Sequence, residues 1–269
     1  MKTKLKFIFP VLLWSLFQAC EKQYPWDFSP VEDHRIIADG IITNELAAQC
    51  INLSWTNPEL NDTIHPVSGA RVVVDDSLNI FEFIEAVEKP GIYYSEPFQV
   101  VVGREYWLTV EYGSETFQAL SEVVPVTALD SMIVILDESR NLYRFIYSGG
   151  NQPSMTEVFY DWSHDTAYCR TYGNCYAQET YYTLDNIDVN AVFSPPRERI
   201  YFPVGTIMIR RKYGLTEEHQ QFIRSLLMET DWSGGIFDIQ HGNVLTNMSN
   251  GALGYFAACM VITDTTVID

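Results

Sequence analysis

The feature that most constrains the fold is a series of short runs rich in Val, Ile, Tyr and Phe between residues 35 and 124, each ended by turn residues. Runs of this length and composition are typical of β-strands, and about seven of them fit into this part of the chain. In the run 106–112 the side chains alternate, so Thr109 and Glu111 should face water. Regular turns at this spacing predict an immunoglobulin-like or prealbumin-like β-sandwich over residues 35–124. The expected strands are 36–42, 50–55, 70–74, 80–84, 91–94, 105–112 and 116–123.

A second β-rich domain is expected over residues 125–269, where Pro125 opens the connection. One amphipathic helix is predicted in it at about 216–229, because Thr216 can cap the helix and acidic residues occupy the first turn, where the helix dipole favours them. An apolar stripe of this helix should pack on the sheet; it consists of Phe222, Ile223, Leu226 and Leu227. The expected strands are 132–136, 142–147, 157–162, 178–184 and 206–210, with one or two closing strands within 253–268.

Residues 1–19 have the pattern of a signal peptide. Three lysines precede an apolar run from Phe7 to Phe17, which is too short to span a bilayer. The run leads into Leu16-Phe17-Gln18-Ala19-Cys20, which resembles a bacterial lipobox. We therefore expect cleavage before Cys20, lipidation of Cys20, and a lipidated tether over residues 20–34. The alternative is an ordinary secretory signal with an unrelated cysteine.

The charge balance limits the class of partner. There are 35 acidic residues against 17 basic ones, a formal net charge of −18, and cleavage of the signal would remove three lysines more. A negative field of this size argues against nucleic acid and against anionic lipid held by its phosphates. Lipid chains must then hold the protein on its membrane, and two or more chains suffice at about 0.8 kcal/mol per buried CH₂.

Four cysteines remain after Cys20, in a compartment that permits disulfides. Cys169 and Cys175 are close in sequence, so we expect them to close a short loop or a hairpin end. Cys50 and Cys259 lie in strand-like runs, where they either pair or remain as buried thiols. The histidines are scattered along the chain without the spacing of metal ligands, so no metal site is expected.

The search for catalytic motifs gives none. The chain lacks a nucleophile elbow, a zinc-protease motif, a phosphate-binding loop and a dinucleotide fingerprint. Paired acids such as Asp75-Asp76 point to opposite faces of a strand, and Glu217-Glu218 are dipole partners at a helix start. Residues 185–190 offer oxygen ligands for calcium, but Ala191 stands where an EF-hand would need glycine. We therefore expect no enzyme activity and no cofactor.

The most suggestive feature for binding is a group of tyrosines around the two close cysteines. Tyrosine gives a large contact area at small entropic cost and carries a polar tip, which suits a glycan, peptide or protein partner. The alternative is a hairpin whose tyrosines only line the sheet, and strand alternation lets only some of them face outward. The group consists of Tyr168, Tyr172, Tyr176, Tyr181 and Tyr182.

Several motifs along the chain resemble one family. Glu21-Lys22 directly follow the lipobox, and further motifs lie at 36–44, 67–70, 234–238, 242–244, 247–250 and 254–256. Together they resemble the domain-of-unknown-function family 4249, over essentially the whole mature chain. This resemblance implies a lipoprotein of Bacteroidota, encoded near TonB-dependent outer-membrane receptors, and carries no catalytic residues. One departure is the last strand region, where Cys259 and Asp264 interrupt an otherwise apolar pattern.

The sequence and the resemblance lead to one expected function. We expect a non-catalytic lipoprotein, anchored in the outer membrane at the cell surface or on the periplasmic face, that assists a TonB-dependent receptor in substrate capture or uptake. The main alternative is a surface adhesin or structural β-sandwich module without a transporter. A hydrolase of surface polymers would need a catalytic site of a kind that these motifs do not show.

Overall fold

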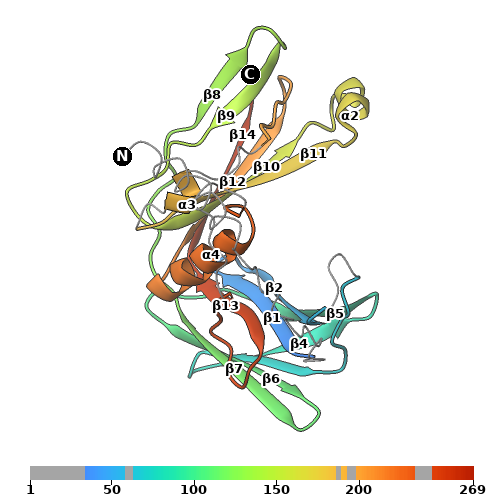
Figure 1. The fold of residues 1–269 in the computed structure, drawn as a ribbon, viewed down its shortest axis with the longest axis vertical. Helices are drawn as coiled ribbons and strands as arrows, with labels where there is room; N and C mark the ends of the chain where they lie inside the picture. Colours follow the sequence, from blue (N-terminus) through green and yellow to red (C-terminus); the bar gives the residue numbers. More distant parts are fainter. Residues whose placement is uncertain (1–33, 58–62, 186–188, 193–197, 234–243) are drawn as a thin grey trace, which may run out of the picture. The chain divides into compact units, whose positions relative to one another are not determined.

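The largest sheet of the computed structural model has eight strands, drawn at the lower part of Figure 1. The structure describes residues 34–269 except 58–62, 186–188, 193–197 and 234–243. The order in this sheet is β13-β1-β2-β5-β4-β3-β6-β7, and only the β1 and β13 pair is parallel. The strands are β1 (Ile36–Thr43), β2 (Ala47–Trp55), β3 (Arg71–Asp75), β4 (Ile80–Ala86), β5 (Lys89–Phe98), β6 (Glu105–Tyr112), β7 (Glu115–Glu122) and β13 (Leu253–Cys259).

The two edge strands of this sheet, β13 and β7, are tied to each other. The backbone N–H of Ala258 in β13 donates to Oγ of Ser121 in β7 at 2.9 Å. Asn247, just before β13, donates from Nδ2 to the carbonyls of Leu120 (3.1 Å) and Phe256 (2.8 Å). These bonds satisfy edge groups that would otherwise be open to other chains. The sheet therefore curls around one core in a sandwich-like or barrel-like arrangement, and the expected mostly-β fold is confirmed.

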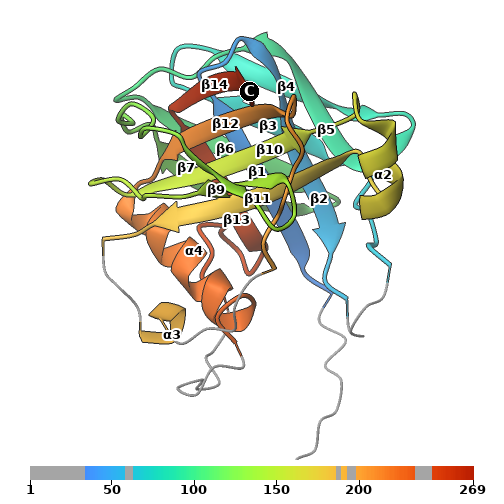
Figure 2. The same ribbon diagram turned by 90° about the horizontal axis from the view of Figure 1, so that it is seen from above.

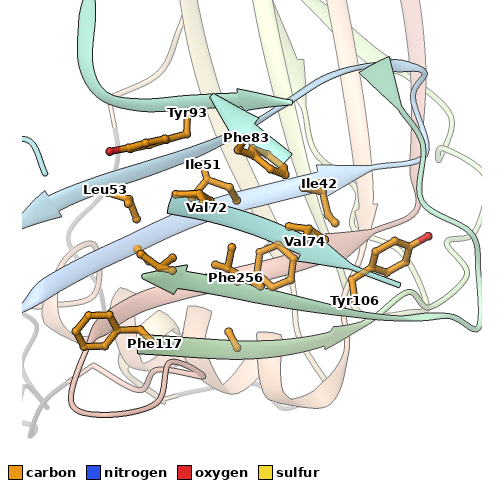
Figure 3. Packing of buried hydrophobic residues seen from close by; sticks show 14 of the residues in the cluster. Ile42, Ile51, Leu53, Val72, Val74, Phe83, Tyr93, Tyr106, Phe117 and Phe256 are labelled. Atoms are coloured by element: carbon orange, nitrogen blue, oxygen red, sulfur yellow. The ribbon is translucent and has the colours of Figure 1, made fainter. Parts of the chain in front are cut away.

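The core of this sheet is built from the inward side chains of alternating positions (Figure 3). Burying each large apolar side chain contributes roughly 1.5–3 kcal/mol relative to exposing it. The buried tyrosines keep their hydroxyls paired, since Tyr93 Oη donates to the carbonyl of Val67 at 2.8 Å and Tyr106 Oη accepts from the N–H of Val101 at 2.9 Å. Figure 3 labels Ile42, Ile51, Leu53, Val72, Val74, Phe83, Tyr93, Tyr106, Phe117 and Phe256.

The second sheet has four antiparallel strands in the order β11-β10-β12-β14, and a separate hairpin packs on one of its faces. Its strands are β10 (Ser154–Asp161), β11 (Tyr176–Thr183), β12 (Ile207–Gly214) and β14 (Val261–Val267), and the hairpin is β8 (Ile133–Asp137) and β9 (Leu142–Ile146). The helices are α2 (Thr166–Tyr172), α3 (Val189–Val192) and α4 (Glu217–Glu229). No helix of the described ranges has the length and apolarity needed to cross a membrane.

The C-terminal strands join the two sheets, because the chain leaves β13 in the first sheet and enters β14 in the second. Phe256 and Ala258 of β13 point into the first core, while Tyr255, Ala257 and Cys259 point toward α4 and the second sheet. β14 is an edge strand with alternating exposure, which explains its polar residues. Residues 34–269 group as one unit, and a domain boundary at residues 124 and 125 stays a prediction. Any two-domain division must assign β13 to the first domain.

The predicted helix at about 216–229 is confirmed as α4. Thr216 caps it, since its Oγ1 accepts from the N–H of His219 at 3.2 Å. The buried residues of α4 are His219, Ile223 and Leu227, whereas Leu226, which was expected in the apolar stripe, is 37% exposed. The buried face is therefore centred closer to His219 than the apolar pattern alone predicted.

The connection between the seventh and eighth strands crosses β12 and is held by a buried lysine. Lys212 is 1% exposed, and its Nζ donates to Thr127 Oγ1 (3.1 Å), to the carbonyl of Ala128 (3.2 Å) and to the carboxylate of Asp130 (3.2 Å). A buried ammonium is tolerated only when it is paired and hydrogen-bonded in this way. The contact fixes the segment from which the β8 and β9 hairpin starts.

Candidate functional site

A short disulfide-closed loop lies between β10 and β11. The Sγ atoms of Cys169 and Cys175 are 2.19 Å apart, so the expected local bridge is confirmed. Within the loop the chain forms α2, which the sequence analysis missed. Asp165 caps this helix by accepting from the N–H groups of Ala167 and Tyr168, and Gly173 ends it in the left-handed conformation. The loop is thus fixed by a covalent bond and by caps at both helix ends.

The other two cysteines do not pair. Cys50 is half-buried on β2 and Cys259 is buried on β13, so the long bridge considered from the sequence is wrong and only Cys259 fits the buried-thiol alternative. Cys259 Sγ lies 3.9 Å from Nδ1 of His219. Burial raises the pKa of Cys259 to about 12 and lowers the pKa of His219 to about 4. Both groups are neutral near pH 7, which argues against a thiolate and imidazolium pair of the kind used in catalysis.

The structure divides the five candidate tyrosines between the two faces of the second sheet. Tyr168 and Tyr172 on α2 pack around Trp162, on the same face as Tyr181 of β11. Tyr176 lies on the opposite face, stacked on Phe159. Tyr182 packs against the cluster under α4. Alternation along β11 separates these side chains, so the five do not form a single patch.

A cleft of about 990 Å³ lies along β11, an edge strand of the second sheet, and a second hollow of about 500 Å³ adjoins it at Tyr172. In Figure 2, β9 passes over β10 and β11, with α2 beside the ends of the same strands. The larger cleft is lined by residues 144–147, by 178–182 of β11 and by 198–200. Tyr172, Glu198 and Arg199 line both hollows. The two hollows therefore adjoin each other at Tyr172, Glu198 and Arg199, and together they are called the cleft.

One wall of the cleft is a rigid pair of rings, one on Tyr147 just after β9 and one on Tyr181 of β11. The ring of Tyr147 stacks on that of Tyr181 with centroids 4.6 Å apart, and Tyr147 Oη lies 2.8 Å from Thr183 Oγ1. Glu179 accepts from the hydroxyls of Tyr160 (2.7 Å) and Tyr181 (2.8 Å). Burial and the neighbouring Glu179 carboxylate raise the pKa of Tyr160 above its ordinary value, so its phenol remains a donor. These contacts hold the Glu179 carboxylate at a fixed place in the cleft.

Tyr172 packs against neighbouring rings on one side and is exposed on the other. Its ring meets the indole of Trp162 edge-on at 4.9 Å between centroids and stacks on Tyr168 at 6.1 Å. Trp162 Nε1 donates to the carbonyl of Asn174 at 2.9 Å, which ties the indole to the disulfide loop. Tyr172 nevertheless remains 45% exposed. Partial burial and the carboxylates of Glu198 and Glu179 raise its pKa, so its hydroxyl stays protonated near neutral pH.

The cleft contains charges of both signs. Arg140, Arg144 and Arg199 line it together with Glu179, Glu198 and Asp231. Arg140 already stacks over the ring of Tyr201, with its Cζ 4.4 Å from the ring centroid. Such a mixture offers paired donors and acceptors to a polar ligand without a strong net field. The arginines and Tyr147 lie outside the tyrosine group and in no motif, so nothing in the sequence singles them out.

Some expected features lie outside what the structure describes. Cys20, the signal peptide and the tether fall in residues 1–33, and the acidic loop considered for calcium falls largely on 186–188 and on side chains of 189–190. Within the described ranges, no group of three or more His, Cys, Asp or Glu residues is placed to hold a metal ion.

Comparison with known families gives one result. The model of the family described as "Domain of unknown function (DUF4249)" matches residues 21–265. The chain belongs to this family. The match begins one residue after Cys20 and runs through both sheets, so the cleft lies within the family region. No curated protein matches the chain.

Proposed function

We propose that this DUF4249 protein is a non-catalytic lipoprotein of the outer membrane that captures a ligand for a TonB-dependent receptor. The observation that supports ligand capture is the cleft between β9, β11 and the disulfide loop. Ligand sites are typically concave, of several hundred Å³, and lined by aromatic residues with a few fixed polar groups. The cleft meets each of these conditions.

The geometry favours binding over catalysis. Glu179 accepts hydrogen bonds from the hydroxyls of Tyr160 and Tyr181, which suits a positioning role. General acid–base catalysis needs a carboxyl group within hydrogen-bond distance of the proton that it transfers. The Cys259 and His219 pair is buried beneath α4, away from the cleft lining. We therefore assign the cleft to recognition.

Purification from native outer membranes tests two parts of the proposal together, the TonB-dependent receptor as partner and the lipid anchor at Cys20. A tagged full-length chain is expressed in its host, solubilised in detergent, and compared with a Cys20→Ala variant. We expect the wild type to carry an acyl modification by mass spectrometry and to co-purify with a β-barrel receptor. An intact, unacylated chain, or an acylated chain that enriches no outer-membrane receptor, would contradict the proposal.

A second candidate function is that of a surface adhesin or structural module. It is favoured by an exposed apolar row on the outer face of the first sheet, in which Trp107 and Leu120 pair directly and Asp75 separates Trp107 from Ile80. Ile80, Trp107 and Leu120 are 66%, 42% and 38% exposed. Contiguous exposed apolar surface often marks an interaction site. If the Trp107→Ser variant reduces cell adhesion, and if the wild type does not co-purify with a receptor, the adhesin function is supported instead.

A further inference from the structure

Tyr172 lines both hollows of the cleft, and its ring is held in place so that a ring-shaped ligand can stack on it. One side of Tyr172 is backed by Trp162 and Tyr168, and the loop beneath it is closed by the Cys169 and Cys175 disulfide. The platform is therefore rigid before any ligand arrives, which lowers the entropic cost of stacking on it. Its exposed part lies where the two hollows meet.

The shape of the cleft indicates a ligand made of several units. A single small molecule would fill one hollow, whereas here cleft space extends on both sides of Tyr172. Polar groups flank the platform on each side, with Arg140 toward the smaller hollow and Arg144 and Glu179 toward the larger. A chain of linked units can place one unit on Tyr172 and its neighbours against these groups.

The charges of the cleft indicate that this chain-like ligand is uncharged. A polyanion would meet Glu179, Glu198 and Asp231 together with the field of a protein of net charge −18. A polycation would be attracted by that net field, but inside the cleft it would meet Arg140, Arg144 and Arg199. An uncharged ligand rich in hydroxyls uses both signs, since each hydroxyl donates to a carboxylate and accepts from a guanidinium.

A peptide fits less well than a sugar chain. Extended peptides are commonly bound along an open strand edge. At Tyr143 the outer edge of β9 is already occupied, because Tyr143 and Phe202 exchange backbone hydrogen bonds of 2.8 and 2.9 Å. The strand β11 ends its sheet and lines the cleft, so it is the side chains of the lining that disfavour a peptide. The cleft lining is dominated by tyrosine and charged side chains rather than by the apolar pockets that receive peptide side chains.

From these observations we infer that the cleft binds a neutral oligosaccharide, with one sugar ring stacked on Tyr172 and adjoining units hydrogen-bonded to Glu179, Glu198 and Arg199. This inference rests on the proposed capture function and specifies its substrate class. Tyr172 contributes the stacking face and a phenol donor, and the flanking charged groups bind pairs of sugar hydroxyls.

The test begins with a printed array of neutral oligosaccharides, acidic oligosaccharides and extended peptides, probed with the full-length chain in detergent. We expect signal on neutral oligosaccharides, and titration calorimetry with the best of them should show affinity rising from disaccharide to tetrasaccharide. No signal on neutral oligosaccharides would overturn the inference. Signal on peptides alone would also overturn it while leaving ligand capture intact, and receptor co-purification tests capture separately.

Two matched variants locate the site. Tyr172→Ala should weaken binding of the selected oligosaccharide about tenfold, as expected for loss of a central aromatic anchor. Tyr172→Phe keeps the ring and should stay within about threefold. Tyr176→Ala is the control, because Tyr176 is 54% exposed on the same hairpin but on the opposite face of the sheet. Thermal melting confirms that each variant is folded. Equal affinities for the Tyr172→Ala and Tyr176→Ala variants would refute the inference.

Discussion

Acidification should destabilise this protein through one buried histidine. His219 lies in the first turn of α4, stacked on the ring of Tyr255 with centroids 4.8 Å apart and 3.9 Å from the thiol of Cys259. Neither neighbour offers a charge to a protonated imidazole, since burial raises the pKa of both Tyr255 and Cys259 to about 12. Burial lowers the pKa of His219 to about 4, from an ordinary 6.5. The folded protein therefore holds this imidazole neutral.

The size of the effect follows from this difference in pKa. Between pH 6.5 and pH 4 the unfolded chain binds a proton at His219 and the folded chain does not, so stability falls as the pH is lowered through this window. At about 1.4 kcal/mol for each unit of pKa, the full loss is on the order of 3 kcal/mol. Above pH 6.5 the contribution is constant, and below pH 4 the loss is complete. Such a loss is a large fraction of the stability of an ordinary domain.

Urea unfolding at a series of pH values measures this loss. Wild type and a His219→Gln variant are compared from pH 7.5 to pH 4.5, so that the other titrating groups cancel. The unfolding free energy of the wild type minus that of the variant should fall by a little under ~3 kcal/mol between pH 7.5 and pH 4.5, because only the wild type loses this contribution. His164→Gln is the matched control, because His164 is exposed whereas His219 is buried. Parallel pH profiles for wild type and His219→Gln would refute the reasoning.

Two further predictions concern the segments that shape the cleft. Replacing Cys169 and Cys175 by serine opens a short loop and should lower the free energy of unfolding by about 2 kcal/mol through loop entropy. The same variant should bind the array-selected oligosaccharide more weakly. An unchanged urea midpoint together with an unchanged affinity would contradict this prediction. Asp130→Asn leaves the Lys212 ammonium buried with neutral partners and should lower the free energy of unfolding by about 3 kcal/mol. Adding Lys212→Met to this variant removes the unpaired charge and should restore most of the lost stability. A double variant no more stable than Asp130→Asn would contradict that pairing.

Local patterns in the sequence predicted the elements that depend on local physics. Alternation of apolar residues gave most strands, and Thr216 with its following acids gave the start of α4. The six-residue separation of Cys169 and Cys175 gave the disulfide. The helix within that loop was missed because α2 has no buried residue and therefore no apolar stripe.

Long-range pairing escaped the sequence analysis. β13 pairs in parallel with β1, more than two hundred residues away in the chain, and no local signal marks that register. One consequence is visible at Gly254, where a Cβ would overlap the backbone carbonyl of Ala38, so close pairing of the two strands requires glycine. Cys259 and Asp264 departed from an apolar pattern because they lie on two different strands in two different sheets.

The candidate site was predicted only in part. The predicted tyrosine group surrounds the disulfide loop, and Tyr168, Tyr172 and Tyr181 share one face of the sheet. The partners that make a cleft come from β9 and from residues 198–200, which reach α2 only through the tertiary fold. Alternation also predicted that some tyrosines would face away, as Tyr176 does.

Hydrogen exchange of the full-length chain, with and without the array-selected oligosaccharide, tests the central claim that the cleft is the ligand site. Slower exchange is expected in β9, in α2 and the disulfide loop at 166–175, and in β11 at 178–182, with no change in β4, β6 or β7. Protection confined to the exposed row of Ile80, Trp107 and Leu120, or protection nowhere in the chain, would contradict the claim.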